Sequence, residues 1–498
     1  MPALLPEDRV PRLVAAQGRD AFAGCDALLV FVPAARAAAA LAALPHAAVL
    51  RERLGQAPRR AGAHVCATLP GGRGTLAVVG LVPAAASTFD LLTLAGAMLR
   101  AVAAVEPACV GLVAAGLPAG DAGRAIEAAA AAALAADFRL PSFTSAAARR
   151  PRLMRIVPGG AGPAAALTRA PAAGTNLVRW LAALPPDRLD PAGYRRLATT
   201  LARRAGLATR FYGERQLAAL GAGAFLAVTR GSARRDAGIL RVSYRPRGAG
   251  RQAPLALVGK GICFDTGGTN LKPHKSMLDM HTDMAGSAVA LATLLALARL
   301  RCPRPVDAWL ALAENRIGPA AYQPQEVVAA MNGTTIQVIH TDAEGRMVLA
   351  DTLALASRSR PAAIVDLATL TGACVTGRTE RYGGAFTIGP GWREAMERAG
   401  RDRGERVWCL PMDEDFDHEL ESKVADVIQC PVDGKGDHIY AARFLSRFVG
   451  AGIPWLHVDL SAATRSGGLA HVPGEVTGFG VRFLLSLLLD QPLPTEPA

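Results

Sequence analysis

The chain has 498 residues, of which 51% are hydrophobic and 19% are charged. This composition supports large cores and excludes general disorder, and the length predicts two domains. Lysine and arginine exceed aspartate and glutamate by 13. A polyanionic partner such as nucleic acid would explain that excess, and so would a solvated arginine-rich surface. The surface interpretation is favoured, because no long basic run with interleaved aromatic residues occurs.

The cysteines and the N-terminus indicate the cellular compartment in which the protein is expected. Eight cysteines are scattered without a CxxC pair, which argues against a disulfide framework and against a structural zinc site. The N-terminus lacks a basic region followed by an apolar core, so no signal peptide is expected. The alanine-rich run over 128–136 is too short to span a bilayer. We therefore expect a soluble, cytoplasmic protein with no membrane partner.

The first part of the chain predicts a smaller N-terminal α/β domain over residues 1–155. Short apolar runs alternate there with alanine-rich stretches. We expect strands over 27–32 and 75–81, and helices over 91–105 and 123–136. No catalytic group of residues is visible in this domain.

A linker is expected over residues 156–195. Its composition is rich in glycine and proline over 157–163 and 171–174, which predicts a loop. A helix is expected over 176–184, ended by Pro185 and the proline after it.

A second α/β domain is expected over residues 196–498, with a central, mostly parallel sheet flanked by helices. The sequence contains apolar runs of strand length separated by longer amphipathic or apolar stretches. The expected strands are 224–228, 239–244, 255–258, 306–313, 363–367 and 455–460, and the expected helices are 284–300, 346–357 and 441–449.

Carboxylates and lysines gather on short segments of this second domain. Lys260 follows an apolar run and is therefore expected near the carboxyl end of a strand, where open α/β sheets build their sites. Asp265 follows in a loop whose glycines allow the backbone to approach a ligand closely. Asp283 begins a long apolar helix. Carboxylates gathered beside cations indicate bound metal or a charge network, because a lone buried carboxylate is too costly.

Asp342 and Glu344 are two residues apart, so in an extended segment both would face one metal cluster. Arg346 would open the following helix. Carboxylate oxygens suit Zn²⁺, Mn²⁺ or Mg²⁺, and the number of carboxylates fits a two-metal hydrolase. Each residue also has an ordinary structural interpretation. Asp342 could cap a helix with Glu344 in its first turn, Arg346 could form a surface ion pair, and Lys260 could be solvent-exposed. These interpretations leave the gathered charge unexplained.

Residues 340–346, His-Thr-Asp-Ala-Glu-Gly-Arg, resemble the Asn-Thr-Asp-Ala-Glu-Gly-Arg signature of the leucyl (cytosol) aminopeptidase family of two-metal exopeptidases. The resemblance extends from about Asn176 to Leu487, with several motifs in the family's order and spacing. The other matching segments are 258–261, 264–268, 271–273, 313–315, 366–373 and 444–448.

The resemblance implies two divalent metal ions per chain, zinc or manganese, with magnesium as a further option. Lys260, Asp265, Asp283 and Glu344 would hold one ion. Asp265, Asp342 and Glu344 would hold the other, so that two carboxylates bridge. A lysine ligand must be neutral, and adjacent divalent charge lowers its pKa enough to allow that.

The resemblance also implies catalytic and substrate-binding roles. Lys272 would polarise the substrate carbonyl, and Arg346 would anchor a bicarbonate ion acting as general base. Leu370 would offer backbone contacts to the substrate. The residues that would line the first side-chain pocket are Met280, Thr369 and Gly372.

Together these roles imply a metallo-aminopeptidase that releases N-terminal amino acids from peptides, with apolar residues such as leucine preferred, and that assembles as a homohexamer. Two segments depart from the family. His340 stands where the family has asparagine, and residues 459–465 replace the family's Asp-Ile-Ala-Gly-Thr-Ala-Trp, which leaves the side-chain preference open. The alternative function is nucleic-acid binding through the basic surface, with or without peptidase activity. An inactive scaffold is disfavoured, because every expected ligand and catalytic residue is present.

Overall fold

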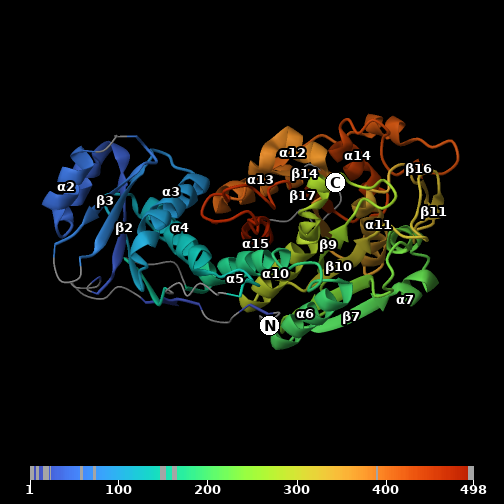
Figure 1. The fold of residues 1–498 in the computed structure, drawn as a ribbon, viewed down its shortest axis with the longest axis horizontal. Coiled ribbons are helices and arrows are strands. Elements are labelled where there is room, and N and C mark those ends of the chain that lie inside the picture. The colour runs from blue at the N-terminus through green and yellow to red at the C-terminus, as the bar shows by residue number, and fades with distance from the viewer. Residues whose placement is uncertain are drawn as a thin grey trace. The chain divides into compact units, whose positions relative to one another are not determined.

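The chain folds into two compact units, each with its own sheet and core (Figure 1). The computed structural model describes residues 5–6, 10–14, 22, 24–56, 60–70, 74–145, 153–159, 165–388 and 391–491. One unit comprises Met1–Ala172, Arg401–Gly404 and Arg465–Thr477, and the other comprises Ala173–Gly400, Glu405–Thr464 and Gly478–Ala498. The expected α/β class with two domains is confirmed. The main division, after Ala172, falls inside the region expected as a linker.

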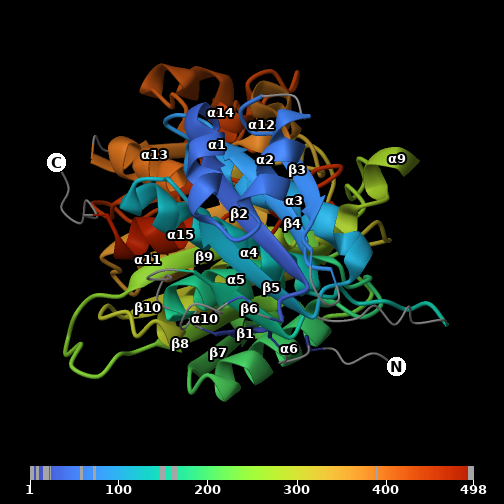
Figure 2. The same cartoon turned by 90° about the vertical axis from the view of Figure 1, so that its left-hand side faces the viewer.

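The first unit is built on a six-stranded sheet (Figure 2). Its strand order is β1 (Arg12–Leu13), β6 (Arg155–Pro158), β5 (Cys109–Ala114), β2 (Ala27–Pro33), β4 (Leu76–Val82) and β3 (His64–Thr68). Among these strands only β3 pairs antiparallel. Side chains alternate across β2, so that Phe31 packs with α3 (Thr88–Val102) and α4 (Ala119–Asp137), while Val30 packs with α2 (Ala47–Gly55). The strands and helices expected in this unit are therefore present.

Two helical stretches are apolar and long enough to cross a membrane by composition alone, Thr88–Val105 and His274–Arg299. Half of the first stretch is buried within the fold, as is 78% of an apolar 18-residue window of the second. The first packs against α4 and β4, and the second covers strands of the larger sheet. Packing inside the units accounts for their apolar character.

The second unit holds an eight-stranded sheet. Its order is β15 (Val407–Cys409), β14 (Gly383–Ile388), β17 (Trp455–Asp459), β13 (Ala363–Ala368), β9 (Leu255–Asp265), β10 (Val306–Asn315), β8 (Gly238–Tyr244) and β7 (Ala208–Gly213). The four central strands, β17, β13, β9 and β10, are mutually parallel. Their carboxyl ends therefore meet at one edge of the sheet, which is where open α/β sheets bind ligands.

Further elements surround this sheet. A three-stranded sheet contains β11 (Val327–Ala329), β12 (Thr335–Gln337) and β16 (Val427–Ile428). The longer helices of the unit are α6 (Pro191–Arg204), α10 (Ala285–Arg299), α11 (Glu344–Ser357), α13 (Gly391–Arg403), α14 (Asp437–Ser446) and α15 (Val481–Leu489), and the shorter ones are α7 (Glu214–Ala219), α9 (His274–Met277) and α12 (Gly372–Arg378).

Helices cover both faces of the central strand β9. A Cβ atom on Gly259 would lie 2.4 Å from the Cα of Ser287 in α10, so glycine at this position allows α10 to pack closely. The next residue, Lys260, points to the opposite face. There α11 presents Gly345, where an added Cβ would lie 2.7 Å from the Cε of Lys260. The alternation of the strand thus directs Lys260 to the first turn of α11.

Four local predictions are wrong. Lys260, expected near the end of a strand, lies in the middle of β9, and Asp265, expected in a loop, is the last residue of that strand. Residues 224–228, expected as a strand, belong to the helix α8 (Gly223–Thr229), because a short buried apolar run does not distinguish the two structures. Residues 171–174, expected as a loop, lie inside the helix α5 (Ala165–Ala182), which accommodates Pro171 in its interior. In the other expected loop, Val157 and Pro158 end β6, and residues 160–163 lie outside the described part of the chain.

Candidate functional site

A cavity of about 600 Å³ lies at the carboxyl ends of the central parallel strands. Every predicted site residue except Glu344 lines it. Glu344 lies directly behind the lining, with Oε1 2.8 Å from the Nζ of Lys260. The lining residues that the sequence predicted are Lys260, Asp265, Lys272, Met280, Asp283, Asp342, Arg346, Thr369, Leu370 and Gly372.

Lys260 lies at the centre of the buried side of the site. Its Nζ is 2.8 Å from Asp283 Oδ2 and 2.8 Å from Glu344 Oε1, and it donates a hydrogen bond to the carbonyl of Thr369 at 3.0 Å. Burial favours the neutral amine, but the attraction to the two carboxylates outweighs it and raises the pKa of Lys260. The interpretation of Lys260 as a solvent-exposed residue is therefore wrong.

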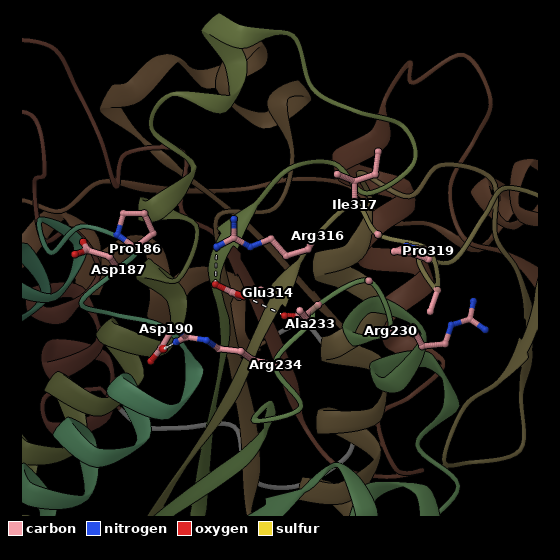
Figure 3. Close-up of a pocket in the computed structure, with 14 residues that line it drawn as sticks. Pro186, Asp187, Asp190, Arg230, Ala233, Arg234, Glu314, Arg316, Ile317 and Pro319 are labelled. Carbon is pink, nitrogen blue, oxygen red and sulfur yellow. Dashed lines mark hydrogen bonds and ion pairs between the residues drawn. The ribbon is translucent and has the colours of Figure 1, made fainter.

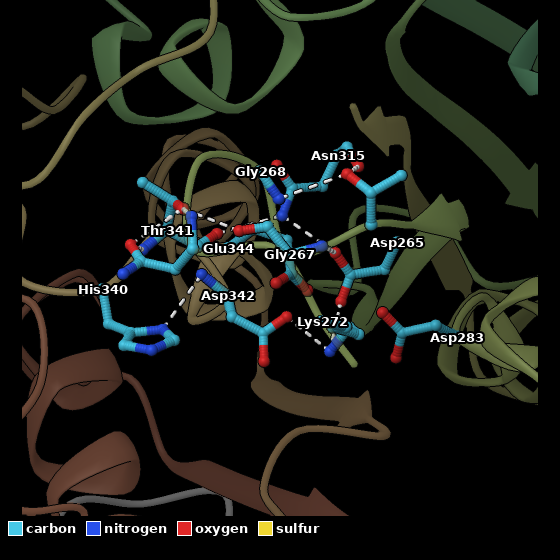
Figure 4. A network of polar contacts seen from close by, with 12 residues as sticks. Asp265, Gly267, Gly268, Lys272, Asp283, Asn315, His340, Thr341, Asp342 and Glu344 are labelled. Carbon is cyan, nitrogen blue, oxygen red and sulfur yellow. Dashed lines mark hydrogen bonds and ion pairs between the residues drawn. The ribbon is translucent and has the colours of Figure 1, made fainter. Parts of the chain in front are cut away.

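Lys272 lies on the other side of the cluster of carboxylates, where it connects Asp265 and Asp342 (Figure 4). Its Nζ is 2.9 Å from Asp265 Oδ2 and 2.5 Å from Asp342 Oδ1. Burial alone would lower the pKa of Lys272. The attraction to these carboxylates is stronger and raises the pKa, so Lys272 stays protonated. The side chain keeps a charged N–H donor at the wall of the cavity.

The geometry of Asp342 and Glu344 differs from the expectation. They do not lie in an extended segment, because Asp342 is in a turn and Glu344 is the first residue of α11. The helix is preceded by Ala343 as its N-cap, with no capping bond from a side chain, so the interpretation of Asp342 as a cap is also wrong. The turn still brings Asp342 and Glu344 together. One oxygen of each and one of Asp265 lie within 4.8 Å of one another.

These residues fit a divalent metal ion. Glu344 is 1% exposed, and its Oε2 atom has no hydrogen-bond partner among the described residues. A buried, charged oxygen without a partner is costly, so the arrangement favours a cation at that atom. Burial also raises the pKa of Asp265 and of Asp283, and neighbouring carboxylates raise both further. A cation would relieve this mutual repulsion.

The loop after β9 is held by residues whose roles the sequence did not reveal. Asn315, at the end of β10, donates from Nδ2 to Asp265 Oδ1 at 2.8 Å and to the carbonyl of Thr341 at 2.9 Å. Gly267 adopts a φ of 86°, and a Cβ there would lie 2.9 Å from an oxygen of Asp342. Asn315 lies in a segment that matches the family, but the sequence did not indicate its hydrogen-bond partners, because they are remote along the chain.

Arg346 is buried rather than exposed on the surface, with 1% of its area accessible. Its guanidinium contacts Asp437 Oδ2 at 2.7 Å and donates to the carbonyl of Gln429 at 3.2 Å. Its Nε atom has no hydrogen-bond partner among the described residues. The interpretation as a surface ion pair is wrong. Arg346 forms a fixed cationic part of the cavity wall.

His340, which departs from the family signature, is exposed and makes a local bond. Its Nδ1 accepts a hydrogen bond from the backbone N–H of Asp342 at 3.2 Å. The buried side chain of Gln429 holds the backbone at residues 339–340 in place. Its Oε1 accepts from the backbone N–H groups of Ile339 and His340, both at 3.1 Å. The contribution of Gln429 was not visible in the sequence.

A larger cavity of about 770 Å³ lies elsewhere in the same unit (Figure 3). Its charged groups are paired, with Arg316 2.9 Å from Glu314 and Arg234 bonded to Asp190. None of the predicted site residues lines it. Size alone therefore does not identify the functional site, and the smaller cavity is the one where the carboxylates and lysines gather.

The chain is similar to known peptidases in sequence. The cytosol aminopeptidase family, catalytic domain, matches residues 176–485. A probable cytosol aminopeptidase of Corynebacterium glutamicum is 40% identical over 316 residues, which cover 63% of this chain and 62% of that protein. Another, from Acidovorax sp., is 42% identical over 335 residues, which cover 67% of this chain and 66% of that protein. The chain thus spans slightly less than two thirds of the length of these relatives.

Solved structures extend the similarity to nearly the whole chain. The bottromycin maturation enzyme BotP in complex with Mn is 33% identical, with a TM-score of 0.80 over 93% of this chain and 98% of that chain. A mutant of tomato leucine aminopeptidase is 26% identical, with a TM-score of 0.84 over 98% of both chains.

Proposed function

Because the chain belongs to the cytosol aminopeptidase family, we propose that it releases N-terminal amino acids from peptides. The observation that carries the proposal is the convergence of four carboxylates and two lysines at one cavity, with a buried oxygen of Glu344 that no described residue partners. If these residues formed only a charge network, that oxygen would be expected to have a partner within it.

Two divalent ions would be held by the predicted ligands. Lys260, Asp265, Asp283 and Glu344 would bind one ion, and Asp265, Asp342 and Glu344 the other. Such ions, when bound, polarise a peptide carbonyl and lower the pKa of water toward neutrality. The manganese complex of a similar enzyme supports manganese as one option, beside zinc and magnesium.

The chain's own residues would bind and orient the peptide. Lys272 keeps its proton and would donate to the oxygen on which negative charge develops. Arg346, whose Nε has no hydrogen-bond partner in the described part of the chain, would hold a bicarbonate ion as the general base. The residues that would receive the first side chain and the backbone of an apolar N-terminal residue such as leucine are Met280, Thr369, Leu370 and Gly372.

Location and assembly are also part of the proposal. The similarity to probable cytosol aminopeptidases supports a cytosolic location. A homohexamer rests on the family resemblance. Nucleic-acid binding, the alternative function, is supported only by the net charge.

The proposal is tested by hydrolysis of a panel of aminoacyl anilides. Protein treated with a chelator should be inactive, and adding back Mn²⁺, Zn²⁺ or Mg²⁺ singly should restore activity with leucine-type substrates. N-acetylated substrates are the matched control and should be inert, because acylation removes the amine lone pair. Activity that survives complete metal removal, or rapid cleavage of an acetylated substrate, would contradict the proposal.

A further inference from the structure

Asp459, the last residue of β17, lies beside the proposed metal ligands without belonging to their set. It is 1% exposed and lines the cavity. In the sheet it is paired with Ala368, the last residue of β13. Its carboxylate therefore reaches the turn that leaves the neighbouring strand.

Both oxygens of Asp459 are used to hold that turn. Oδ1 accepts from the backbone N–H of Leu370 at 3.2 Å, and Oδ2 accepts from the hydroxyl of Thr371 at 2.7 Å. Thr371 in turn caps α12, because its Oγ1 accepts from the backbone N–H of Cys374 at 3.2 Å. A group that only accepts, with two oxygens, suits this pair of donors.

The turn that Asp459 holds contacts two of the proposed metal ligands. The carbonyl of Thr369 accepts from Lys260 Nζ at 3.0 Å, and the hydroxyl of Thr369 donates to Asp283 Oδ1 at 2.7 Å. Thr369 therefore orients one nitrogen and one oxygen of the same proposed site. Its own position depends on Leu370 and Thr371, the residues that Asp459 binds.

We propose that Asp459 is a positioning residue, which fixes the 369–371 turn so that Thr369 orients Lys260 and Asp283 toward a divalent cation. The inference rests on the proposed function for the identity of the ligands. Residues that orient metal ligands typically change metal affinity or activity by about 10–100-fold when replaced. A residue that only stabilises the core would change neither.

Asp366 offers a matched control in the adjacent strand β13. It is as deeply buried as Asp459, and its oxygens contact Trp455 Nε1 and His457 Nδ1, both at 2.6 Å. These are core partners, and neither is a proposed ligand. Replacing Asp366 should therefore lower stability without altering the metal site.

The experiment is a calorimetric titration of metal-stripped full-length protein with Mn²⁺, together with melting temperatures and the KM and kcat for a leucyl anilide. Asp459→Ala should bind Mn²⁺ about 10–100-fold more weakly. Asp459→Asn is the conservative variant that preserves the fold, and it should fall between the parent and Asp459→Ala, because one amide oxygen can still accept from Leu370. Asp366→Asn should melt at a lower temperature and bind Mn²⁺ as the parent does. Thr371→Val should add little to the loss of Mn²⁺ affinity in Asp459→Ala, since the bond between these two residues is already absent there, and the lost cap of α12 should appear in the melting temperature.

Parent-like Mn²⁺ affinity in both Asp459 variants would overturn the inference, as would equal weakening in Asp459→Asn and Asp366→Asn. A parent that binds Mn²⁺ but cleaves no peptide would overturn the proposed function alone, because the affinity comparison still tests the positioning role. A parent that binds no Mn²⁺ would overturn both.

Discussion

Lys260 and Lys272 carry the same charge within one group of carboxylates, but their surroundings give them different roles. Lys260 is enclosed beneath the first turn of α11, between Asp283 and Glu344. Lys272 lies at the cavity wall and retains 13% of its side-chain exposure. The enclosed Lys260 would bind an ion once adjacent divalent charge lowers its pKa enough to remove its proton, whereas the accessible ammonium of Lys272 is suited to meeting a substrate.

Replacing Lys272 should therefore separate catalysis from metal binding. Lys272→Ala should lower kcat by about 10²–10³, the loss typical of one oxyanion donor. Its Mn²⁺ affinity should be retained or increased, because the ammonium no longer competes for Asp265 and Asp342. Steady-state kinetics and calorimetry measure the two quantities, with Lys272→Arg as the charge-retaining control. An unchanged kcat in Lys272→Ala would contradict the assignment.

The carboxylates should differ in the number of ions they affect. Glu344→Ala should lower the metal content of the protein from two ions to fewer than one, because the residue is proposed to bridge. Asp283→Ala should lose mainly one ion. Elemental analysis of protein dialysed against the same buffered metal concentration distinguishes the two. Equal stoichiometry in both variants would argue against the bridging role of Glu344.

At the scale of elements, the sheet could be predicted better than the site. The central strands β9, β10, β13 and β17 are buried and mostly apolar, and the sequence predicts them from that pattern. The helix α8 was mistaken for a strand because seven residues are too few to show a period. The proposed ligands followed from the family motif. The contacts of Asn315 and Gln429 could not be predicted, although Asn315 lies in a segment that matches the family, because their hydrogen bonds join residues 26 to 90 positions apart.

The helix α15 provides a test of stability at this scale. Glu405 Oε2 accepts from the backbone N–H groups of Gly480 and Phe483 at 2.9 and 2.8 Å. It thus provides an acceptor for two N–H groups at the start of the helix, where no helical carbonyl is available. Burial raises the pKa of Glu405 to about 7, although these bonds oppose the rise. The folded protein therefore binds a proton more tightly at this residue than the unfolded chain does. Stability from this group is greatest at acid pH and falls as the pH rises toward 7.

Glu405→Gln should remove this pH dependence, because glutamine is neutral throughout. Relative to the variant, the parent should lose up to about 3 kcal/mol in free energy of unfolding as the pH rises from about 4.5 to 7. Urea denaturation of both proteins at pH 5 and pH 8 measures the difference, and comparing them cancels the pH dependence that the other titratable groups contribute to both proteins. Parallel pH profiles would show that the carboxyl group titrates normally.

At the scale of the whole molecule, chemistry and charge are distributed differently. The proposed ligands all belong to the second unit, whereas the excess of 13 positive charges is spread over the sequence. Many arginines of the second unit are already paired, as Arg443 is with Asp417 at 2.7 Å and Arg241 is with Asp307 at 2.6 Å. Because these cations are paired or dispersed, few of them are placed to bind the successive phosphates of a nucleic acid.

Binding to DNA should therefore be weak and non-specific. At physiological salt we expect a Kd on the order of 10⁻⁴–10⁻⁶ M, the range for purely electrostatic contact, and a steep loss of affinity as salt rises. Fluorescence anisotropy with two unrelated duplexes of equal length, titrated at low and physiological salt, provides the measurement and its control. Because counterion release depends on charge and not on sequence, the two duplexes should bind equally. Nanomolar binding to one duplex only, retained at physiological salt, would make nucleic-acid recognition a second function of the chain.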